Sequence, residues 1–563
     1  MAVASNFPAI RPSLNLDFAN SKVLDPRITF NRASAATYYD GKTVAKAEEN
    51  LFIYSQTFSS GPWVKVSATI TDSFGVAPDG STTAARLQAT GSYSFGQAPS
   101  GVVSGKEYVL SFWVKSNTGV DQTFRSQYGT TGFQSNVAST SWTRVQWLVT
   151  WSGFAGIYLA VSDIAGNPLD ILIWGAQLEQ RSQVTAYTPT TTQPITNYIP
   201  VLQTAPAGVP RFDHNPVTGE SLGLLVEEQK TNLFTFSEQF ENSAWGKSNL
   251  VVESNSCVAP DGSLSADKLI ESSTNTVHAI TWSFLNNTAE QIVSFYAKAA
   301  GRSVITTSSN GSISAAVASF NLNAVTATGA QAISITPVGN GWFRCVFKKT
   351  VVTNNPHTLS ISLHNEISSS YLGDGYSGIY IWGAQLEAGA FPTSYIKTDA
   401  SQVTRAADSA QMTGSNFSSW YQQGEGSLIA EARNIVGATV FSTAVLTDDQ
   451  ALQTNNRLAL FNRPSGVSGA CALISYGNSE QISNGFIFKE INKIAIAYKN
   501  NDVTAALNGS TSTQDILANI PAFTKLRIGQ LTAGSDFFAT QTIKRLTYYP
   551  KRLTDAQLQA LTA

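Results

Sequence analysis

Charged side chains are scarce in this chain of 563 residues, of which they make up 13%. That is about half the usual share of a soluble domain. Lys and Arg number 36 against 38 Asp and Glu, so the formal net charge is −2, and no stretch is strongly basic. Without a basic patch the chain has no electrostatic attraction for nucleic acid or an anionic membrane. Ser, Thr, Asn, Gln and Gly fill the surface instead, which favours β-structure that works outside a cytoplasm.

Cysteine, histidine and long apolar runs are also rare. The cysteines Cys257, Cys345 and Cys471 are odd in number and widely spaced, so we expect buried free thiols rather than a disulfide framework. The histidines form no H-E-x-x-H motif or close Cys/His cluster, so no metal site is predicted. The sequence contains no run of about eighteen apolar residues, the length that would span a membrane. The first residues lack a signal-peptide pattern, so we expect no route to the exterior by secretion.

What the chain does contain is an internal repeat. The heptapeptide IWGAQLE occurs at residues 173–179 and again at 381–387. Other matching pairs are NLF at 50–52 and 232–234, VAPDGS at 76–81 and 258–263, Phe112-Trp113 and Phe295-Tyr296, Trp142 and Trp342, and Tyr187 and Tyr395. Two divergent copies of one module therefore lie in tandem, at residues 50–190 and 232–402.

Each repeated block is typical of an antiparallel β-sandwich. The Pro-Asp-Gly triplets are turn sequences, because proline pre-sets one φ angle and glycine accepts a conformation closed to other residues. Segments 108–116 and 292–300 are rich in β-branched and aromatic residues and end in turn-forming clusters. ILIW and IYIW, which contain the start of the heptapeptide, are apolar on both faces. We therefore predict that IWGAQLE is the closing core strand of a jelly roll.

Residues 403–563 do not repeat this pattern and predict a third sandwich. Strands are expected at 426–432, 457–461, 493–499, 503–509, 526–529 and 542–549. A terminal helix should begin at Thr554, with Gln557 completing a capping box and Leu553 and Leu558 forming a hydrophobic staple. Residues 1–49 and 191–231 lack a sandwich pattern of their own. We interpret both as extended arms that lead into the modules.

These motifs together resemble structural proteins of tailed bacteriophages. The resemblance rests on RITFNRASAATYYDGK (27–42), PRFDHNPVTGESLGLLVEEQKTNLF (210–234), the APDGS turn, GNGWFRC, and the IWGAQLE segment followed by VTRAAD (403–408). It implies jelly rolls similar to carbohydrate-binding modules. The C-terminal part, with ALNG, LRIG and YYPKRLTDAQLQAL, resembles concanavalin A-like sandwiches of the laminin G type. The family's arms usually join directly, whereas here a complete extra module stands between them, which favours an elongated shape.

Catalytic motifs are weak. Residues 219–223 satisfy the G-x-S-x-G pattern, and His214 precedes them, but a nucleophile elbow requires a parallel α/β sheet. The repeated acids Glu179 and Glu387 occur in both copies, which favours a scaffold role over glycoside hydrolysis. Calcium could bind Asp79, Asp261 or Asp374, although such residues more often cap their own turns. We therefore predict a protein that is not an enzyme and has no required cofactor.

Aromatic side chains are the predicted glycan-binding groups. Tryptophans that recur in both copies are expected in the core, because core packing is needed in every module. The aromatic residues without a match, which we expect on the surface as glycan contacts, are Tyr128, Phe133, Trp151 and Phe154.

The preferred functional hypothesis is a virion protein on the phage exterior, a tail fibre or receptor-binding component. Its modules would bind host surface glycans by multivalent contacts, in a homo-oligomer expected to be a trimer, with residues 1–49 anchoring it to other virion proteins. A purely architectural capsid decoration, head fibre or baseplate protein is the alternative. A polysaccharide depolymerase is the third hypothesis. The sequence lacks the repetitive β-helix pattern of many such enzymes, which argues against it.

Overall fold

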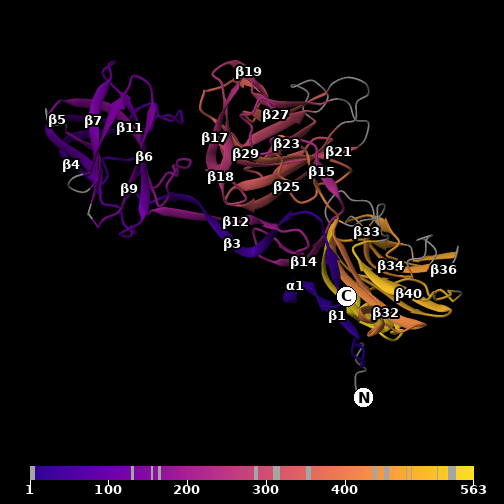
Figure 1. Ribbon diagram of the computed structural model, residues 1–563. Helices are drawn as coiled ribbons and strands as arrows, with labels where there is room; N and C mark the ends of the chain where they lie inside the picture. Colours follow the sequence, from indigo (N-terminus) through magenta and orange to yellow (C-terminus); the bar gives the residue numbers. More distant parts are fainter. Residues whose placement is uncertain are drawn as a thin grey trace.

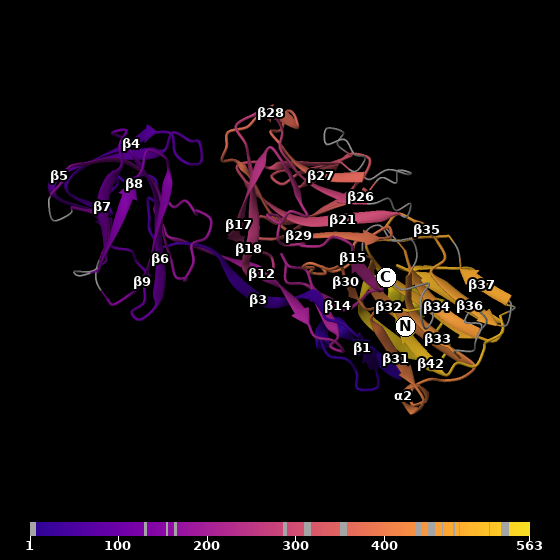
Figure 2. The same cartoon turned by 45° about the horizontal axis from the view of Figure 1, so that its top comes forward.

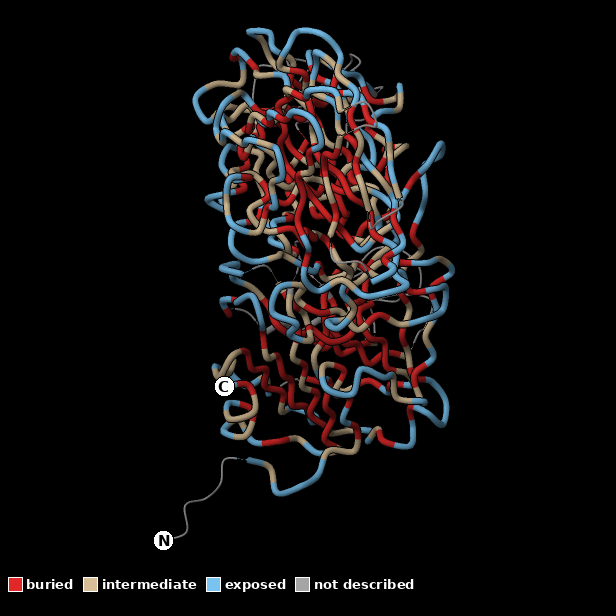
Figure 3. Tube along the Cα trace, turned by 90° about the vertical axis from the view of Figure 1, so that its left-hand side faces the viewer, coloured by how far each residue is buried: buried red, intermediate tan, exposed pale blue. Residues whose placement is uncertain are grey.

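The computed structural model describes residues 7–128, 132–153, 156–162, 166–284, 290–308, 317–349, 357–434, 441–448, 456–463, 465–476, 479–483, 485–516, 518–530 and 540–563. Within these ranges the chain is built almost wholly of antiparallel strands, which confirms the predicted all-β class. Module 1 (residues 50–190), module 2 (232–402) and the C-terminal sandwich (403–563) follow one another across Figure 1. Buried segments run through the interior of the sandwiches, as the tube in Figure 3 shows.

Module 1 folds around strands that change layer along their length. Its strands are β4 (Trp63–Gly75), β5 (Ala84–Gln97), β6 (Glu107–Ser116), β7 (Gln122–Tyr128), β8 (Gly132–Ala138), β9 (Thr143–Thr150), β10 (Ile157–Val161) and β11 (Leu169–Glu179). They hydrogen bond in the order β8-β7-β10-β5-β11-β6-β9, with β4 also on β5. The first half of β5 pairs with β11 and its second half with β10, so one long strand serves both layers.

Module 2 has the same strand order with its long strands interrupted. Its main strands are β16 (Gly246–Ser248), β17 (Leu250–Val258), β18 (Leu264–Glu271), β20 (Ala279–Phe284), β21 (Gln291–Ala300), β22 (Val304–Ser308), β23 (Ala318–Asn321), β24 (Thr326–Thr328), β25 (Ala332–Gly339), β26 (Trp342–Lys349), β27 (His357–His364) and β29 (Gly378–Ala388). The short pair β19 (Asn275–Val277) and β28 (Ser370–Leu372) lies beside them. Apart from the additional edge strands β24 and β25, the orders β17-β18-β29-β21-β26-β25 and β16-β20-β27-β22-β23-β24 reproduce those of module 1, which confirms the predicted duplication.

The repeated letters have equivalent structural roles in the two copies. IWGAQLE lies in β11 and in β29, each a central strand of its sheet, as predicted. The asparagine of NLF binds this strand: Asn50 accepts a hydrogen bond from the backbone N–H of Leu178, and Asn232 accepts one from Leu386. An identical set of buried polar contacts therefore locks the first and last segments of each module together.

The C-terminal sandwich contains the strands expected from the sequence and others that were not predicted, such as those at 441–447 and 472–476. Its own strands are β31 (Ser409–Thr413), β32 (Glu425–Asn434), β33 (Phe441–Thr447), β34 (Asn456–Asn462), β35 (Ser468–Gly469), β36 (Ala472–Tyr476), β37 (Ser479–Ser483), β38 (Phe486–Ile487), β39 (Ile491–Lys499), β40 (Asp502–Leu507), β41 (Ser510–Thr511), β42 (Lys525–Ile528) and β43 (Gln541–Tyr549). The helices of this unit are α2 (Ser415–Ser418) and α3 (Asp555–Thr562). Thr554 and Gln557 form the predicted capping box of α3, and Leu553 and Leu558 are both buried.

The segments interpreted as arms also supply strands to this sandwich. They contain β1 (Leu14–Asp17), helix α1 (Phe18–Ser21), β2 (Thr29–Asn31), β13 (Arg211–His214) and β14 (Ser221–Val226). β14 and β1 pair with successive halves of β43, and β2 pairs with β31. An unpaired edge strand exposes backbone groups that seek partners, and these segments cover those edges. Strands β1, β2 and β14 therefore pair within their own chain, and the anchoring of residues 1–49 to other virion proteins stays a prediction.

A two-stranded ribbon connects the units. Strands β3 (Ala36–Asn50) and β12 (Ile195–Ala205) pair along their length and pass beneath module 2 (Figure 1 and Figure 2). Tyr39 and Leu202 of the ribbon pack into one apolar cluster with Tyr296 and Trp342 of module 2. The short pair β15 (Lys230–Asn232) and β30 (Val403–Arg405) then joins the start and end of this module. Module 2 thus has a face that the ribbon seals from solvent.

Five buried charges join the ribbon, the hairpin β13–β14 and the segment leading into the C-terminal sandwich. Arg32 and Arg211 bind the two carboxylate oxygens of Asp408 at 3.0 and 2.6 Å, and Arg211 also binds Glu227 at 2.7 Å. Arg405 lies 3.5 Å from Glu227, and all these side chains are at most 1% exposed. These residues belong to the motifs that carry the phage resemblance. They are far apart in the sequence, so the sequence alone did not predict that they contact one another.

Acid should weaken this charge network. Burial raises the pKa of Glu227, but Arg405, Arg211 and hydrogen bonds from Ser394 outweigh it and lower the pKa to about 2. The unfolded pKa is about 4.3, so the resulting stability is complete above that pH and is lost as the pH falls toward 2. We expect the unfolding free energy of the wild type to drop by roughly 3 kcal/mol more than that of Glu227→Gln across this window. Urea titrations at a series of pH values measure the unfolding free energy of both proteins. An equal dependence of that free energy on pH in the two proteins would contradict the prediction.

Cysteine burial follows the sequence expectation: Cys257, Cys345 and Cys471 are buried free thiols. Among the helices in the described ranges, none is long and apolar enough to cross a bilayer.

Candidate functional site

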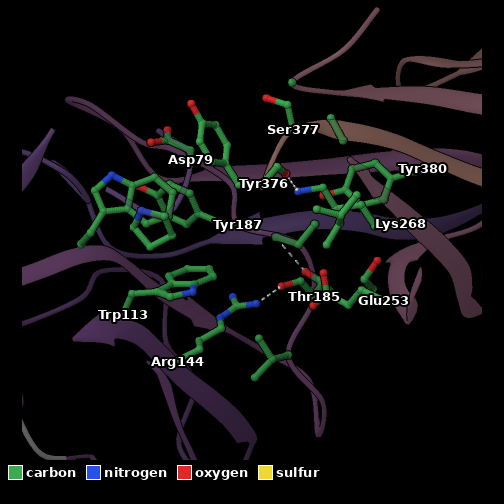
Figure 4. A pocket seen from close by; sticks show the side chains of 18 of the residues that line it. Asp79, Trp113, Arg144, Thr185, Tyr187, Glu253, Lys268, Tyr376, Ser377 and Tyr380 are labelled. Atoms are coloured by element: carbon green, nitrogen blue, oxygen red, sulfur yellow. Dashed lines mark hydrogen bonds between the residues drawn. The ribbon is translucent and has the colours of Figure 1, made fainter. Parts of the chain in front are cut away.

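A cavity of about 760 Å³ lies between module 1 and module 2. Figure 4 shows side chains from both modules around it. The module 1 wall comes from β6, β9, β11 and the segment after β11, and the module 2 wall from β17, β18, β29 and the loop before β29. β9 and β18 contribute alternate residues, because successive side chains of a strand point to opposite faces. β17 contributes the successive residues 253–256, where its register with β18 is interrupted.

The module 1 wall is an aromatic cluster with one cation. Trp113 and Tyr187 pack against Trp174 with ring centroids 5.1 and 4.5 Å apart. The guanidinium carbon of Arg144 lies 4.1 Å from the centre of the Trp113 ring, and this side chain donates to the Thr185 carbonyl at 2.9 Å. Burial lowers the pKa of Arg144 to about 10, against the opposing effect of nearby carboxylates, so it remains a cation at neutral pH.

The module 2 wall is more polar. Lys268 donates to the backbone carbonyl of Tyr376 at 2.9 Å, and burial lowers the pKa of its ammonium group. The Tyr376 ring packs directly on Gly80 of module 1, where any side chain would collide with it. Tyr380 also lines the wall, and burial raises the pKa of its phenol well above the ordinary value. Glu253 adds a carboxylate, so acids and bases are balanced around the cavity.

In module 2, the ribbon covers the face that is equivalent to the aromatic wall of module 1. Tyr296, Trp342 and Tyr395 are at most 3% exposed because the ribbon packs on them. Their counterparts in module 1, Trp113, Trp142 and Tyr187, are only half-buried. We predicted core positions for all the repeated tryptophans, and this is correct for Trp63, Trp174, Trp245, Trp342 and Trp382. It is wrong for Trp113 and Trp142, because the ribbon that buries the equivalent face of module 2 does not reach them.

A second hollow continues the cavity along the module boundary. It has a volume of about 700 Å³ and shares Gln146, Val184 and Asn255 with the first. Leu148 of β9 is exposed beside it, whereas the Trp147 ring packs against the core of module 1. The two hollows together make a groove whose aromatic side chains lie in the first hollow.

The four aromatic residues predicted as glycan contacts do not form one site. Phe133 is 51% exposed on β8, whereas Tyr128 is half-buried on β7. The strand register pairs Phe133 with Gln127, so Phe133 and Tyr128 face opposite sides of the sheet. Trp151 is 5% exposed and packs against Tyr108 and Tyr128, so its expected surface position is wrong. Phe154 lies outside the described residues. A glycan role for Tyr128 and Phe133 stays a prediction.

Trp151 is buried because its backbone closes a turn. Its N–H donates to the carbonyl of Lys106, and its own carbonyl accepts from Gly105. These bonds draw the end of β9 over the core, where a large ring fills space that its sequence neighbours leave open.

The weak catalytic motifs have structural roles. Glu179 and Glu387 are fully buried, and each accepts hydrogen bonds from the hydroxyl and N–H of one threonine, Thr185 or Thr393. Ser221 lies in β14, which pairs antiparallel with β13, so the G-x-S-x-G residues form a hairpin rather than a nucleophile elbow.

The three aspartates considered as calcium ligands bind neighbouring groups of the chain. Asp79 and Asp261 each accept from the backbone N–H of the serine two residues later. Asp374 accepts from the N–H groups of Tyr376 and Ser377 and pairs with Arg302. Within the described residues, no group of three or more His, Cys, Asp or Glu side chains could hold a metal ion.

Sequence reasoning missed Trp113, Arg144 and Tyr187 as site residues. A signal was present, because Trp113 is replaced by tyrosine in the second copy while the residues around it are repeated. The exchange of a large indole for a smaller ring indicates that the two faces have different surroundings.

No protein-family model and no curated protein matches this chain. Solved structures with some similarity include carbohydrate-binding modules. The CBM40 module of a Ruminococcus gnavus IT-sialidase, bound to α2,3-sialyllactose, has 13% identity and a TM-score of 0.22, covering 25% of this chain and 84% of that one. The tandem CBM22-1 and CBM22-2 domains of Paenibacillus barcinonensis Xyn10C have 14% identity and a TM-score of 0.21, covering 63% and 100%. Trypanosoma rangeli sialidase has 8% identity and a TM-score of 0.21, covering 94% and 98%.

Proposed function

We propose that this protein binds glycans in the groove between modules 1 and 2 without altering them chemically. The observation that carries the proposal is the module 1 face of Trp113, Arg144 and Tyr187, which borders a cavity of about 760 Å³, whereas the ribbon leaves its copy in module 2 only a smaller one of about 280 Å³. Flat aromatic rings suit the apolar faces of pyranose rings, and the surrounding side chains donate and accept hydrogen bonds. The charges on the walls balance, which favours a neutral, hydroxyl-rich ligand over an anion.

The length of the groove favours an oligosaccharide over a single sugar. Its two hollows, of about 760 and 700 Å³, each fall within the size range of ordinary small-molecule sites, and they are continuous. A polysaccharide chain on a cell surface could occupy both. Each site would be weak, and several copies of the protein would together bind firmly.

The biological setting we propose is the exterior of a tailed-phage virion, in a tail fibre or receptor-binding component, with a trimer as the expected assembly. This part rests on the sequence resemblance of the arms, the PDG turn, IWGAQLE and VTRAAD. An architectural role in a capsid decoration, head fibre or baseplate is the second candidate. The ribbon that braces module 2 and the contact of Tyr376 on Gly80 favour it, because both stiffen the connection between units.

Replacing Trp113 by alanine should lower the affinity for glycans at least about tenfold, which corresponds to about 1.4 kcal/mol. Screening the full-length protein on an array of bacterial surface polysaccharides would identify a ligand for titration calorimetry. Phe133→Ala is the matched control, since it removes an exposed aromatic residue away from the groove and should leave the affinity unchanged.

The opposite pattern, with binding lost in Phe133→Ala and kept in Trp113→Ala, would place the site on the outer face of β8. Absence of binding by the wild type to every glycan on the array would favour the architectural role.

A further inference from the structure

Module 2 has its own cavity at the position equivalent to the groove in module 1. It has a volume of about 280 Å³. Tyr296, Arg344, Thr393 and Tyr395 line it, and these are the counterparts of Trp113, Arg144, Thr185 and Tyr187. Arg344 donates to the carbonyl of Thr393 and the hydroxyl of Ser294, as Arg144 does to Thr185 and Ser111. The duplication has therefore kept a hollow beside this arginine in both copies.

The two cavities differ in what covers them. In module 1 the opposite wall is module 2, whereas in module 2 it is the ribbon and the hairpin β13–β14. The ribbon contributes Tyr38 and Tyr39, and the hairpin contributes Asp213 and His214. The result is a smaller space bordered by several tyrosines and by Leu and Val side chains.

Three polar atoms on residues of this wall are buried and have no hydrogen-bond partner among the described residues. They are the Tyr39 hydroxyl, His214 Nε2 and Arg344 Nε. His214 is 2% exposed and Tyr39 is 9% exposed, so solvent does not satisfy these side chains. A buried polar group without a partner costs about 1 to 3 kcal/mol, so several around one cavity indicate a missing partner. In the module 1 cavity Arg144 Nε likewise has no partner among the described residues.

We propose that this cavity is a second ligand site, which holds a single neutral pyranose. The choice of a sugar rests on the proposed glycan-binding function, because the same framework lines the groove in module 1. Sugar hydroxyls both donate and accept, so one ligand could pair with a guanidinium N–H, a phenol and either tautomer of an imidazole. Tyrosine rings supply flat apolar faces for the ring carbons. The volume of about 280 Å³ has room for about one ring, so this site would take a terminal or free sugar through its open side, where the exposed Thr336 lies.

The charges around the cavity also favour an uncharged ligand. Glu227 on its wall is already paired with Arg211 and Arg405. Asp213 accepts a hydrogen bond from the Tyr39 N–H at 2.8 Å, and burial raises its pKa to about 6. Arg344 donates to neutral acceptors, so an anion could pair with it only beside the carboxyl groups of Asp213 and Glu227, and any net charge would have to be desolvated at a cost.

Saturation-transfer NMR and titration calorimetry on the full-length protein would test the second site. The probes are the methyl glycosides of glucose, galactose, mannose and N-acetylglucosamine, each measured alone. Thr336→Trp fills the module 2 cavity from an exposed strand position that lines it, and Val184→Trp fills the groove of module 1. Both variants leave the buried clusters intact, and their thermal unfolding serves as the folding check.

We expect at least one monosaccharide to bind the wild type and Val184→Trp equally, and Thr336→Trp at least about tenfold more weakly. Binding that Val184→Trp abolishes and Thr336→Trp leaves unchanged would overturn the second site and support the groove. Binding that only Thr336→Trp abolishes, together with no oligosaccharide binding, would retain the second site and reject the groove. No binding of any probe to the wild type would overturn this proposal, and the polysaccharide array would still decide the other.

Discussion

Replacing Asp408 by alanine is expected to lower the unfolding free energy by roughly 3 to 5 kcal/mol, the usual cost of removing one partner from a buried ion pair. Asp408 binds Arg32 and Arg211 at once, and its carboxylate also accepts from the N–H of Glu227 at 3.0 Å. Without it, two buried guanidinium groups lose their principal counter-charge in a place that water does not reach. Urea denaturation of the full-length protein measures the effect.

The matched control is Asp25→Ala. Asp25 also pairs with an arginine, Arg27, at 2.7 Å, but the two side chains are 20% and 31% exposed. Partly exposed pairs of this kind contribute about 0 to 1 kcal/mol, so the control should change little. A cost for Asp408→Ala no greater than that of Asp25→Ala would show that the buried charges do not hold the three segments together.

The two copies of one tryptophan should respond differently to the same substitution. Trp342 is fully buried, and Trp342→Ala is expected to cost roughly 3 to 5 kcal/mol as a large-to-small core change. Its counterpart Trp142 makes the same hydrogen bond, from indole N–H to a valine carbonyl, yet it is half-buried. Trp142→Ala should cost only about 1 kcal/mol, near the centre of the range for point substitutions. Calorimetric unfolding of the full-length variants checks the difference.

A second pair of tryptophans provides the control for this comparison. Trp63 and Trp245 are 2% and 1% exposed, and each donates its indole N–H to a backbone carbonyl at 3.0 Å. Their alanine variants should therefore lose similar amounts of stability. Equal losses for Trp142 and Trp342 would mean that the ribbon does not distinguish the two faces.

Local patterns predicted the strands and turns well because their causes lie within a few residues. The capping box at Thr554 and Gln557 depends on a spacing of three positions and formed as expected. The heptapeptide IWGAQLE is apolar enough to be buried on both faces, and it lies in the centre of a sheet in each module. Repetition strengthened these predictions, since a segment needed by the scaffold must appear in both copies.

Contacts between residues far apart in the sequence were not predicted at several positions. Arg32, Arg211 and Asp408 lie far apart in the chain, and no local signal shows that they meet. The strands β1, β2 and β14 are short, and their pairing with β43 and β31 depends on edges that exist only after the sandwich has formed. Trp151 was expected at the surface because it has no aromatic counterpart, but burial depends on which backbone segment folds over the core.

The sequence by itself determined the all-β class, the tandem duplication, the jelly-roll strands and the capped terminal helix, because alternation, turn chemistry and repetition are local properties. Only the tertiary structure decided where the candidate sites lie. The two modules carry nearly the same aromatic and arginine residues, yet the ribbon covers most of one face and does not reach the other. Whether a tryptophan is core or binding surface depends on what packs against it, and a distant segment of the chain makes that contact.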